Sequence, residues 1–336
     1  MVPDRGPTRR AVLRVGPSLL LAAGAARRAA AQPVERPLLD RPARVVVGYP
    51  GGGAADIIAR LYAERLRGPF APQAVVDNRP GASARLAVEA VKAAAPDGTT
   101  ILCTPESVFT IYPHIYPRTT RYEVSTDFVP VSALAAFPFG VAVAASHPAR
   151  DLDGFVRWAR GRGEVPYASP SPGSTPHLLA AQMARARGLD LAHVAYRGTG
   201  PALVDLTAGR IALVSAVLGD LTEQHRAGAV RILASTAPAR SPRLPEVPVF
   251  AELGLPELVA ETWYAMLLPA GTPAPVVDAL HRAIEAGSRD PQLREALARQ
   301  ELTAISSTPA VLAERLRAER DRWAPIVRDT GYTAEE

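Results

Sequence analysis

Short apolar runs alternate along most of the chain with segments whose apolar residues recur at helical spacing. The β-branched run at 44–48 predicts a buried strand. After it, Ile58, Leu61, Tyr62 and Leu66 recur at i, i+3, i+4 and i+8, which predicts a helix with one buried face. This alternation is typical of α/β proteins. Further strands are predicted at 74–76, 99–103, 165–169, 192–196, 211–217 and 230–235.

Glycine and proline mark the ends of the predicted helices. Pro176 and Pro201 are expected at the first helical position, with Thr175 and Gly200 as the caps before them. Three strand–helix units follow one another between 165 and 228, which predicts a parallel sheet with right-handed crossovers. The proline-rich stretch after them is expected to be extended and irregular. The predicted helices include 87–95, 176–187, 201–208, 221–227, 275–286, 292–298 and 309–327.

Length and charge narrow the class of protein. A chain of 336 residues exceeds a typical single domain and suits two. The formal net charge of +5 would by itself suit a nucleic-acid-binding protein. However, residues 1–31 hold six arginines and one acid, Asp4, and this accounts for the whole excess. The remainder is formally neutral and lacks the basic stripe that phosphate binding requires.

Residues 1–31 resemble an export signal. Arg9 and Arg10 match the twin-arginine pattern, an apolar stretch follows at 15–26, and three alanines end the segment at Ala31. The apolar stretch is shorter than the roughly 20 residues that span a bilayer. We therefore predict a periplasmic protein whose signal is cleaved near Ala31. The alternative is a basic tail that remains attached. The sequence leaves the route open between twin-arginine export and general secretory export.

The chain has one cysteine, Cys103, so it forms no intrachain disulfide. Its position in a predicted strand indicates a buried, unreactive thiol rather than a nucleophile.

Three loops share one design, since each follows a predicted strand and opens a helix. They cover 49–56, 169–177 and 196–201 and are rich in glycine, serine and threonine. Free backbone N–H groups and the helix dipole attract anions to such helix starts. In open α/β sheets, ligands bind beyond the carboxyl ends of the strands. One such loop is better explained as an ordinary turn, but three in two α/β halves favour a cleft that binds a carboxylate.

An ordered set of motifs runs from about Arg41 to the end of the chain. In order they are PGGG with Asp56, DNRPGA, APDGTT, YP with Tyr116, DFVPV, YAS, GSTPHL, YRG before PAL, SP before LPEVP, and LLPAGTP. No single motif is specific. The ordered set is similar to the Bug family, the TctC-like periplasmic solute-binding proteins of tripartite tricarboxylate transporters.

The resemblance implies a type II periplasmic-binding-protein, or Venus flytrap, architecture. It consists of two α/β domains joined by two crossover segments, near Pro138 and Trp263. Domain 1 would cover 32–137 and 264–336, and domain 2 would cover 138–263. Ligand carboxylates would meet the three loops, partly through ordered waters. The residues expected at the ligand are Tyr49, Gly52, Gly53, Ala54, Asp56, Ser169, Ser174, Thr175, His177, Tyr196, Arg197, Gly198, Thr199 and Ala216.

Two positions depart from the family pattern. The family often has an aspartate where this chain has Ala216, and an asparagine or serine near Glu106. A glutamate beside an anion site repels a second carboxylate unless it points away or accepts a donor. If Ala216 faces the cleft, the ligand is expected to lack an amine and to carry one carboxylate on an apolar body. Alternatively, Ala216 is ordinary core packing.

Enzymatic and regulatory functions are the alternatives. His177 lies near Ser169 and Ser174 in sequence, and Asp205 or Asp220 would complete a hydrolase-like triad, but the chain has no G-x-S-x-G elbow. A carboxylate sensor or a regulator's effector domain would share the architecture, and the regulator would also need a DNA-binding region. We predict a binding protein that is not an enzyme.

No cofactor, metal or nucleic acid is expected. The six histidines are scattered without metal-ligand spacing, and the Gly-Thr-Gly at 198–200 lacks the third glycine of a dinucleotide fingerprint. The partners that the resemblance implies are a small carboxylate and the membrane subunits of a tripartite tricarboxylate transporter.

Overall fold

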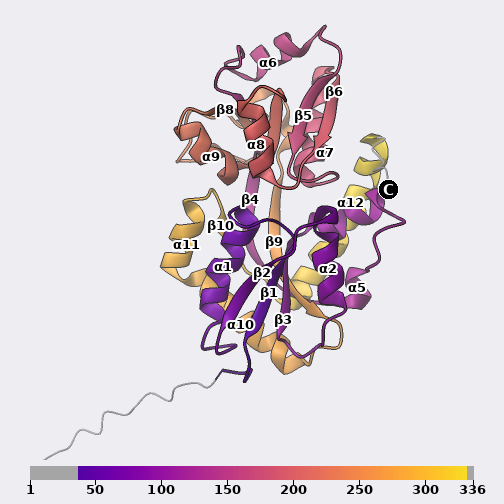
Figure 1. The fold of residues 1–336 in the computed structure, drawn as a ribbon, viewed down its shortest axis with the longest axis vertical. Coiled ribbons are helices and arrows are strands. Elements are labelled where there is room, and N and C mark those ends of the chain that lie inside the picture. The colour runs from indigo at the N-terminus through magenta and orange to yellow at the C-terminus, as the bar shows by residue number, and fades with distance from the viewer. Residues whose placement is uncertain (1–36, 331–336) are drawn as a thin grey trace, which may run out of the picture. The chain divides into compact units, whose positions relative to one another are not determined.

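Ten strands form one mixed sheet within residues 37–330, the part of the chain that the computed structural model describes (Figure 1). The strands are β1 Ala43–Val47, β2 Ala74–Asn78, β3 Thr100–Pro105, β4 Phe128–Ala144, β5 Val165–Ser169, β6 Leu191–Ala195, β7 Leu213–Val217, β8 Val230–Ser235, β9 Glu261–Pro269 and β10 Thr303–Ala304. Their order is β2-β1-β3-β9-β4-β7-β5-β6, and β8 and β10 pair with β4. The predicted export signal lies outside the described residues.

Helices connect the strands and cover the sheet. The α-helices are α1 Ala54–Leu66, α2 Arg85–Lys92, α3 Ser107–Thr110, α4 Tyr112–Ile115, α5 Val124–Asp127, α6 Leu152–Ala159, α7 Thr175–Arg187, α8 Thr199–Thr207, α9 Leu218–Arg226, α10 Ala274–Arg289, α11 Pro291–Ala298 and α12 Pro309–Thr330. Short 3-10 helices are η1 Ala82–Ala84, η2 Phe250–Leu253 and η3 Pro256–Leu258. No helix in the described ranges has the length and apolar composition needed to span a membrane.

The strand pairing confirms the α/β class. Strands β5, β6 and β7 pair in parallel, as the successive strand–helix units predicted. Strand β8 pairs antiparallel with β4, as β7 does, so it runs in the same direction as β5, β6 and β7 on the other side of β4. The proline-rich stretch at 238–248 contains neither helix nor strand, as expected.

Strand β4 extends through both halves of the sheet. Its residues pair with β9 from Phe128 to Pro138 and with β7 from Phe139 onward. The two expected crossover points therefore lie within β4 and β9, where Pro138 is paired with Glu261 and Ala136 with Trp263. The sequence did not reveal β4 because it is buried on both faces and interrupted by two prolines, so it shows no alternation of apolar and polar residues.

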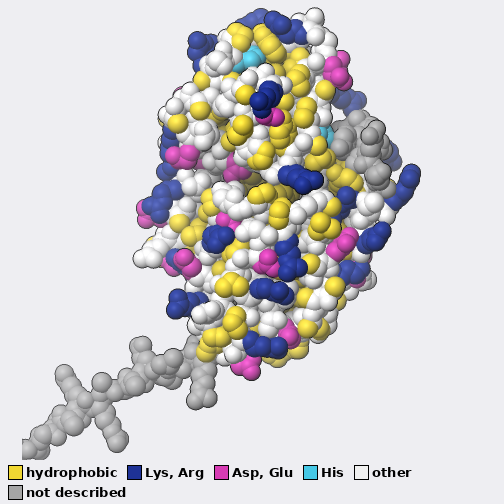
Figure 2. All heavy atoms as spheres, in the orientation of Figure 1, with side chains coloured by type: hydrophobic (Ala, Val, Ile, Leu, Met, Phe, Trp, Pro, Cys, Tyr) yellow, Lys and Arg dark blue, Asp and Glu magenta, His cyan; other side chains and the backbone are white. Residues whose placement is uncertain are grey.

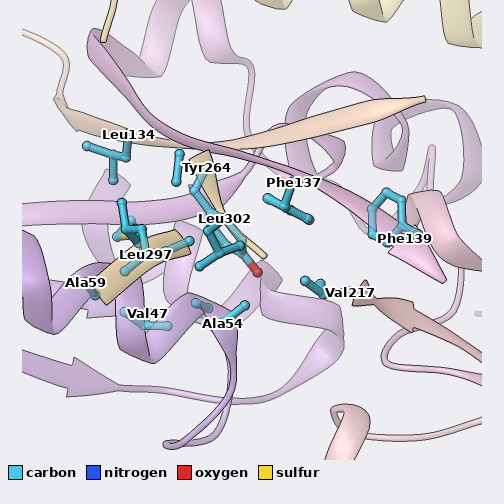
Figure 3. Close-up of a cluster of buried hydrophobic side chains, with 14 of the residues drawn as sticks. Val47, Ala54, Ala59, Leu134, Phe137, Phe139, Val217, Tyr264, Leu297 and Leu302 are labelled. Atoms are coloured by element: carbon cyan, nitrogen blue, oxygen red, sulfur yellow. The ribbon is translucent and has the colours of Figure 1, made fainter. Parts of the chain in front are cut away.

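Apolar side chains of the sheet and its helices form the core. Figure 3 shows one buried cluster in which Val47 of β1 and Ala54 of α1 lie with Leu134 of β4 and Leu297 of α11. Cys103 of β3 belongs to this cluster, and burial raises the pKa of its thiol to about 12. The thiol is thus buried, as the sequence predicted.

The surface carries both signs of charge. On the face shown in Figure 2, basic and acidic side chains are interspersed and no continuous basic stripe is visible. This distribution agrees with the formally neutral composition of the chain beyond residue 31.

Helix α9 and the segment between α11 and β10 approach each other at Gly219. A Cβ atom at this position would lie 1.8 Å from the carbonyl oxygen of Gln300. Only glycine allows this approach, because no real Cβ contact is so short.

We expect Gly219→Ala to lower the free energy of unfolding by about 1–3 kcal/mol, the usual cost of overpacking. Urea unfolding of the purified protein measures this loss. Gly200→Ala is the matched control, because an added Cβ there meets nothing within 4 Å. It should leave stability unchanged or raise it by up to about 1 kcal/mol. Equal stability of the Gly219→Ala variant and the parent would show that the two segments do not approach this closely in solution.

Candidate functional site

A cavity of about 430 Å³ lies where the starts of three helices meet. Its walls come from the loops before α1, α7 and α8, from the β7–α9 junction, and from strands β4 and β9. A cavity of this size suits a small molecule. The helices α1, α7, α8 and α9 all follow strands of the sheet, so the cavity lies beyond the carboxyl ends of β1, β5, β6 and β7.

At the three helix starts that line the cavity, the N-cap residues themselves provide no side-chain cap. Helix α1 begins after Gly53, α7 after Ser174 and α8 after Gly198, and none of these residues makes a capping hydrogen bond through a side chain. Thr175 and Gly200 were the predicted caps of the last two helices, and both lie inside the helices instead. The first N–H groups of a helix lack partners within it, so these starts offer backbone donors and positive dipole ends to a ligand.

Asp56 stabilises the first loop through side-chain hydrogen bonds. Its Oδ2 atom accepts hydrogen bonds from the Gly52 N–H at 3.0 Å and from Arg60 Nε at 2.8 Å. Burial opposes the charge of Asp56, but these hydrogen bonds outweigh it and lower the pKa of the carboxyl group. Gly52 has a φ of 91°, a left-handed conformation that favours glycine. Asp56 is buried and does not line the cavity.

His177 supports the second loop rather than facing the cavity. Its Nδ1 atom accepts a hydrogen bond from the Gly173 N–H at 2.9 Å, and its ring stacks on His193 at 3.8 Å between centroids. Burial lowers the pKa of His177 to about 2 and that of His193 to about 4, so both rings are neutral at pH 7. Ser169 Oγ bonds His193 Nε2 at 2.8 Å. Ser169 and His177 thus form a buried polar layer behind the loop.

The third loop lies between two cavities. Arg197 and Gly198 line the large cavity and also a second cavity of about 290 Å³. Tyr196 lines only the second cavity, and its hydroxyl donates to Asp205 Oδ2 at 2.6 Å. The Arg197 side chain is exposed, and within residues 37–330 its guanidinium makes no hydrogen bond or ion pair. It is thus available to an anion that enters either cavity.

Asp220 is the acidic residue that the sequence did not assign to the site. It lines the cavity from α9, and its Oδ1 accepts from the Ala54 N–H at 3.3 Å. Its Oδ2 accepts from Thr199 Oγ1 at 2.6 Å. Burial raises the pKa of the Asp220 carboxyl, although these two hydrogen bonds act in the opposite direction. Ala216, by contrast, is fully buried in a core cluster and does not line the cavity.

Glu106 lies behind the wall that Thr175 and Thr262 form. Its carboxylate accepts from Thr175 Oγ1 and from the Trp263 N–H, each at 3.4 Å. The side chain is buried, and this burial raises the pKa of the carboxyl group to about 7 despite the hydrogen bonds that it accepts. The Glu106 carboxylate therefore accepts hydrogen bonds, and this arrangement relieves the repulsion between Glu106 and a nearby anion.

Aromatic and aliphatic side chains form the apolar wall of the cavity. Phe137 stacks on Tyr264 with ring centroids 5.1 Å apart, and Phe139 meets Phe137 edge-on at 5.4 Å. Figure 3 shows these rings with Val217 in one buried cluster. The cavity therefore presents one polar side, at the helix starts, and one apolar side, at β4 and β9.

Most of the predicted site residues come together at the large cavity. Nine of them line it: Tyr49, Gly52, Gly53, Ala54, Ser174, Thr175, Arg197, Gly198 and Thr199. Five do not, namely Asp56, Ser169, His177, Tyr196 and Ala216. Because Ala216 lies in the core while Asp220 lines the cavity, the argument for an amine-free ligand loses its basis. Ligand contact by the lining residues stays a prediction.

Comparison with known proteins places this geometry in a family. Residues 58–332 match the family described as "Tripartite tricarboxylate transporter family receptor". The chain belongs to this family. "Protein BugT" of Bordetella pertussis is 33% identical over 87% of this chain and 90% of its own length.

Two solved structures share the fold. Periplasmic binding protein BugD is 27% identical, with a TM-score of 0.82 over 88% of this chain and 100% of that one. Rpa4515 of R. palustris, solved with adipate, is 30% identical, with a TM-score of 0.83 over 87% of this chain and 97% of that one. The family and these neighbours are binding proteins and not enzymes, and BugD is a periplasmic one. The predicted family, fold class and non-enzymatic nature are therefore confirmed.

The buried carboxyl group of Glu106 makes the stability of this family member depend on pH. Its pKa is about 7 in the folded protein and near 4.5 in the unfolded chain. The folded state therefore binds more protons between these values, and stability falls as pH rises from 4.5 to 7. Glu106→Gln removes this loss. Relative to the parent, the variant should gain up to about 3 kcal/mol on going from pH 4.5 to pH 8, as urea unfolding at each pH would show.

Glu123→Gln is the matched control with the opposite sign. Arg320 pairs with Glu123 at 2.6 Å, and the pKa of Glu123 is lowered because this pairing outweighs the effect of burial. The control variant should thus lose stability relative to the parent as pH rises through the acid range. A pH-independent difference between Glu106→Gln and the parent would contradict the raised pKa of Glu106.

Proposed function

We propose that the chain is an exported solute-binding protein that captures a small carboxylate in the 430 Å³ cavity for a tripartite tricarboxylate-type transporter. The observation that carries the proposal is the convergence of three uncapped helix starts on one cavity. Each start supplies backbone N–H donors and the positive end of a helix dipole. A small carboxylate is one of the anions that such helix starts bind.

Arg197 supplies the positive charge of the proposed site. It lies beside the start of α8, at the junction of the two cavities, and forms no ion pair within the described residues. A guanidinium can bind a carboxylate through two parallel hydrogen bonds. The apolar wall of Phe137, Phe139 and Tyr264 would then hold the body of the ligand.

We also propose that the 430 Å³ cavity lies between two lobes, which are the predicted domains 1 and 2, and that these lobes close on the ligand. Lobe 1 would comprise 32–137 and 264–336, and lobe 2 would comprise 138–263. The strand pairing supports this division, since β4 leaves β9 at Pro138 and joins β7 from Phe139. The cavity also takes lining residues from both ranges. A ligand that contacts both lobes binds the closed form better and shifts the population toward it.

The relatives support the proposed class of ligand and the proposed delivery to a transporter. The structure of Rpa4515 contains adipate, a small carboxylate, and the matched family is named as a transporter receptor. We therefore propose delivery to the membrane subunits of such a transporter. Export to the periplasm, with cleavage near Ala31, completes the proposal.

Ligand capture is tested first with a thermal-shift panel of amino, hydroxy, aromatic and dicarboxylic acids on protein lacking residues 1–31. An acid present at 100 times its Kd should stabilise the protein by about 2.7 kcal/mol. We expect Arg197→Gln to lower the affinity for the tightest-binding acid by about tenfold in calorimetry, because a charged hydrogen bond contributes about 1.5 kcal/mol. Arg210→Gln is the control, since Arg210 is exposed and paired with Asp205. Equal affinity of Arg197→Gln and the parent would remove Arg197 from the site.

The export route is tested by replacing Arg9 and Arg10 with lysine, which preserves the charge of the segment. If export uses the twin-arginine route, the full-length precursor should accumulate in the cytoplasm, as immunoblots of cell fractions would show. Normal accumulation of the double variant in the periplasm would rule out that route and leave general secretory export.

A further inference from the structure

One carboxylate of the protein itself lies at the helix starts of the cavity. Asp220 accepts hydrogen bonds from the Ala54 N–H at the start of α1 and from Thr199 Oγ1 at the start of α8. Two of the three uncapped starts are therefore joined by a protein carboxylate within the cavity. At the start of α7, Thr175 Oγ1 donates to Glu106 at 3.4 Å behind the cavity wall, and among the described residues neither Ser174 nor Thr175 bonds a carboxylate that lines the cavity.

This arrangement changes what the cavity accepts. A ligand with two carboxylates would have to place one of them beside Asp220, where the two negative charges repel each other with little water to screen them. The donors at Ala54 and Thr199 that would relieve the repulsion are already engaged. A second ligand carboxylate is thus disfavoured at this end of the cavity.

The Asp220 carboxylate still has capacity to accept. Two carboxylate oxygens offer about four lone-pair positions, and the described structure uses two of them. The side chain keeps part of its surface open, and it lines the cavity. A donor on the ligand would therefore find an acceptor there, and a charged donor would also offset the cost of keeping an ionised carboxylate buried.

We propose that Asp220 makes this cavity select an acid with one carboxylate and, at its other end, an ammonium or hydroxyl donor. The carboxylate of the ligand binds the start of α7 and Arg197, and the donor binds Asp220. This inference rests on the proposed capture of a carboxylate. It distinguishes the chain from Rpa4515, whose structure holds the dicarboxylate adipate.

Acids that differ only in their end group test the inference. Glutarate, 5-aminopentanoate and 5-hydroxypentanoate share one chain length. The same comparison is made with succinate and its amino and hydroxy analogues, which are shorter, and with adipate and its amino and hydroxy analogues, which are longer. Calorimetry on the parent should show a donor acid binding at least about tenfold more tightly than the dicarboxylate of the same length, a difference of about 1.4 kcal/mol. The ammonium and hydroxyl acids separate the two kinds of donor.

Two variants assign the preference to Asp220. Asp220→Asn keeps the shape but removes the charge, so it should bind the dicarboxylate and the donor acid within about threefold of each other. Glu223→Gln is the matched control, because Glu223 lies on the same helix and lines the same cavity. It is exposed and paired with Arg226 at 3.5 Å, so the variant should keep the preference of the parent.

The outcomes separate this inference from the proposed function. If dicarboxylates bind the parent at least as tightly as donor acids at every length, the role of Asp220 is wrong while carboxylate capture stands. The same holds if Asp220→Asn binds with the preference of the parent. If no acid of any series binds the parent, carboxylate capture fails and this inference fails with it. The ranking on the parent needs no variant, so a folding defect in Asp220→Asn does not remove the test.

Discussion

The continuous strand β4 is the constraint on which the cleft depends. It pairs with β9 up to Pro138 and with β7 and β8 beyond it, so one stretch of backbone fixes both halves of the sheet. Helices α1, α7, α8 and α9 then begin just after strands whose positions this pairing sets. Their starts surround one cavity because the sheet places the carboxyl ends of those strands there. The backbone donors at the cavity are thus a product of topology, and no dedicated cationic residue needs to be buried to provide them.

Burial controls the charge of the groups around the cleft. The buried environment raises the pKa of Asp220 and Glu106 and lowers the pKa of His177 and His193. The histidines are therefore neutral spacers behind the second loop. The acids hold their positions through hydrogen bonds from Thr199, Ala54, Thr175 and Trp263. Glu223 is exposed and paired with Arg226, so charge that a ligand can meet directly is left to Asp220 and to Arg197.

Much of the fold could be predicted from the sequence, because local apolar patterns and Gly or Pro signals were sufficient. Strands β5 and β8 occur where the runs at 165–169 and 230–235 placed them. Strand β4 could not be predicted, since burial on both faces erases the alternation that identifies a strand. The N-caps of α7 and α8 are Ser174 and Gly198, which precede the predicted caps Thr175 and Gly200. The prediction failed because proline is also tolerated later in the first turn of a helix, where the missing N–H has no partner within the helix.

The candidate site was predictable only as far as it lies in the loops. Residues of the three loops line the cavity because each loop opens a helix beyond the end of a strand. Asp220 could not be assigned, since its partner Ala54 is 166 residues away and no local pattern joins them. The sequence also placed the start of α9 at Leu221, three residues late, which left Asp220 outside the helix. The sequence left open whether Ala216 faces the core or the cavity, because a strand residue can face either, and Ala216 lies in the core.

The single cysteine makes the protein suited to selective chemical labelling. Cys103 is the one thiol of the 336-residue chain, it is fully buried in β3, and its pKa is raised to about 12. Thiol reagents react with the exposed thiolate form, which Cys103 does not offer at neutral pH. A cysteine introduced at the rim of the cavity would therefore take up a fluorescent dye alone, without removal of the native residue. The same protein would then report the arrival of its ligand as an optical signal.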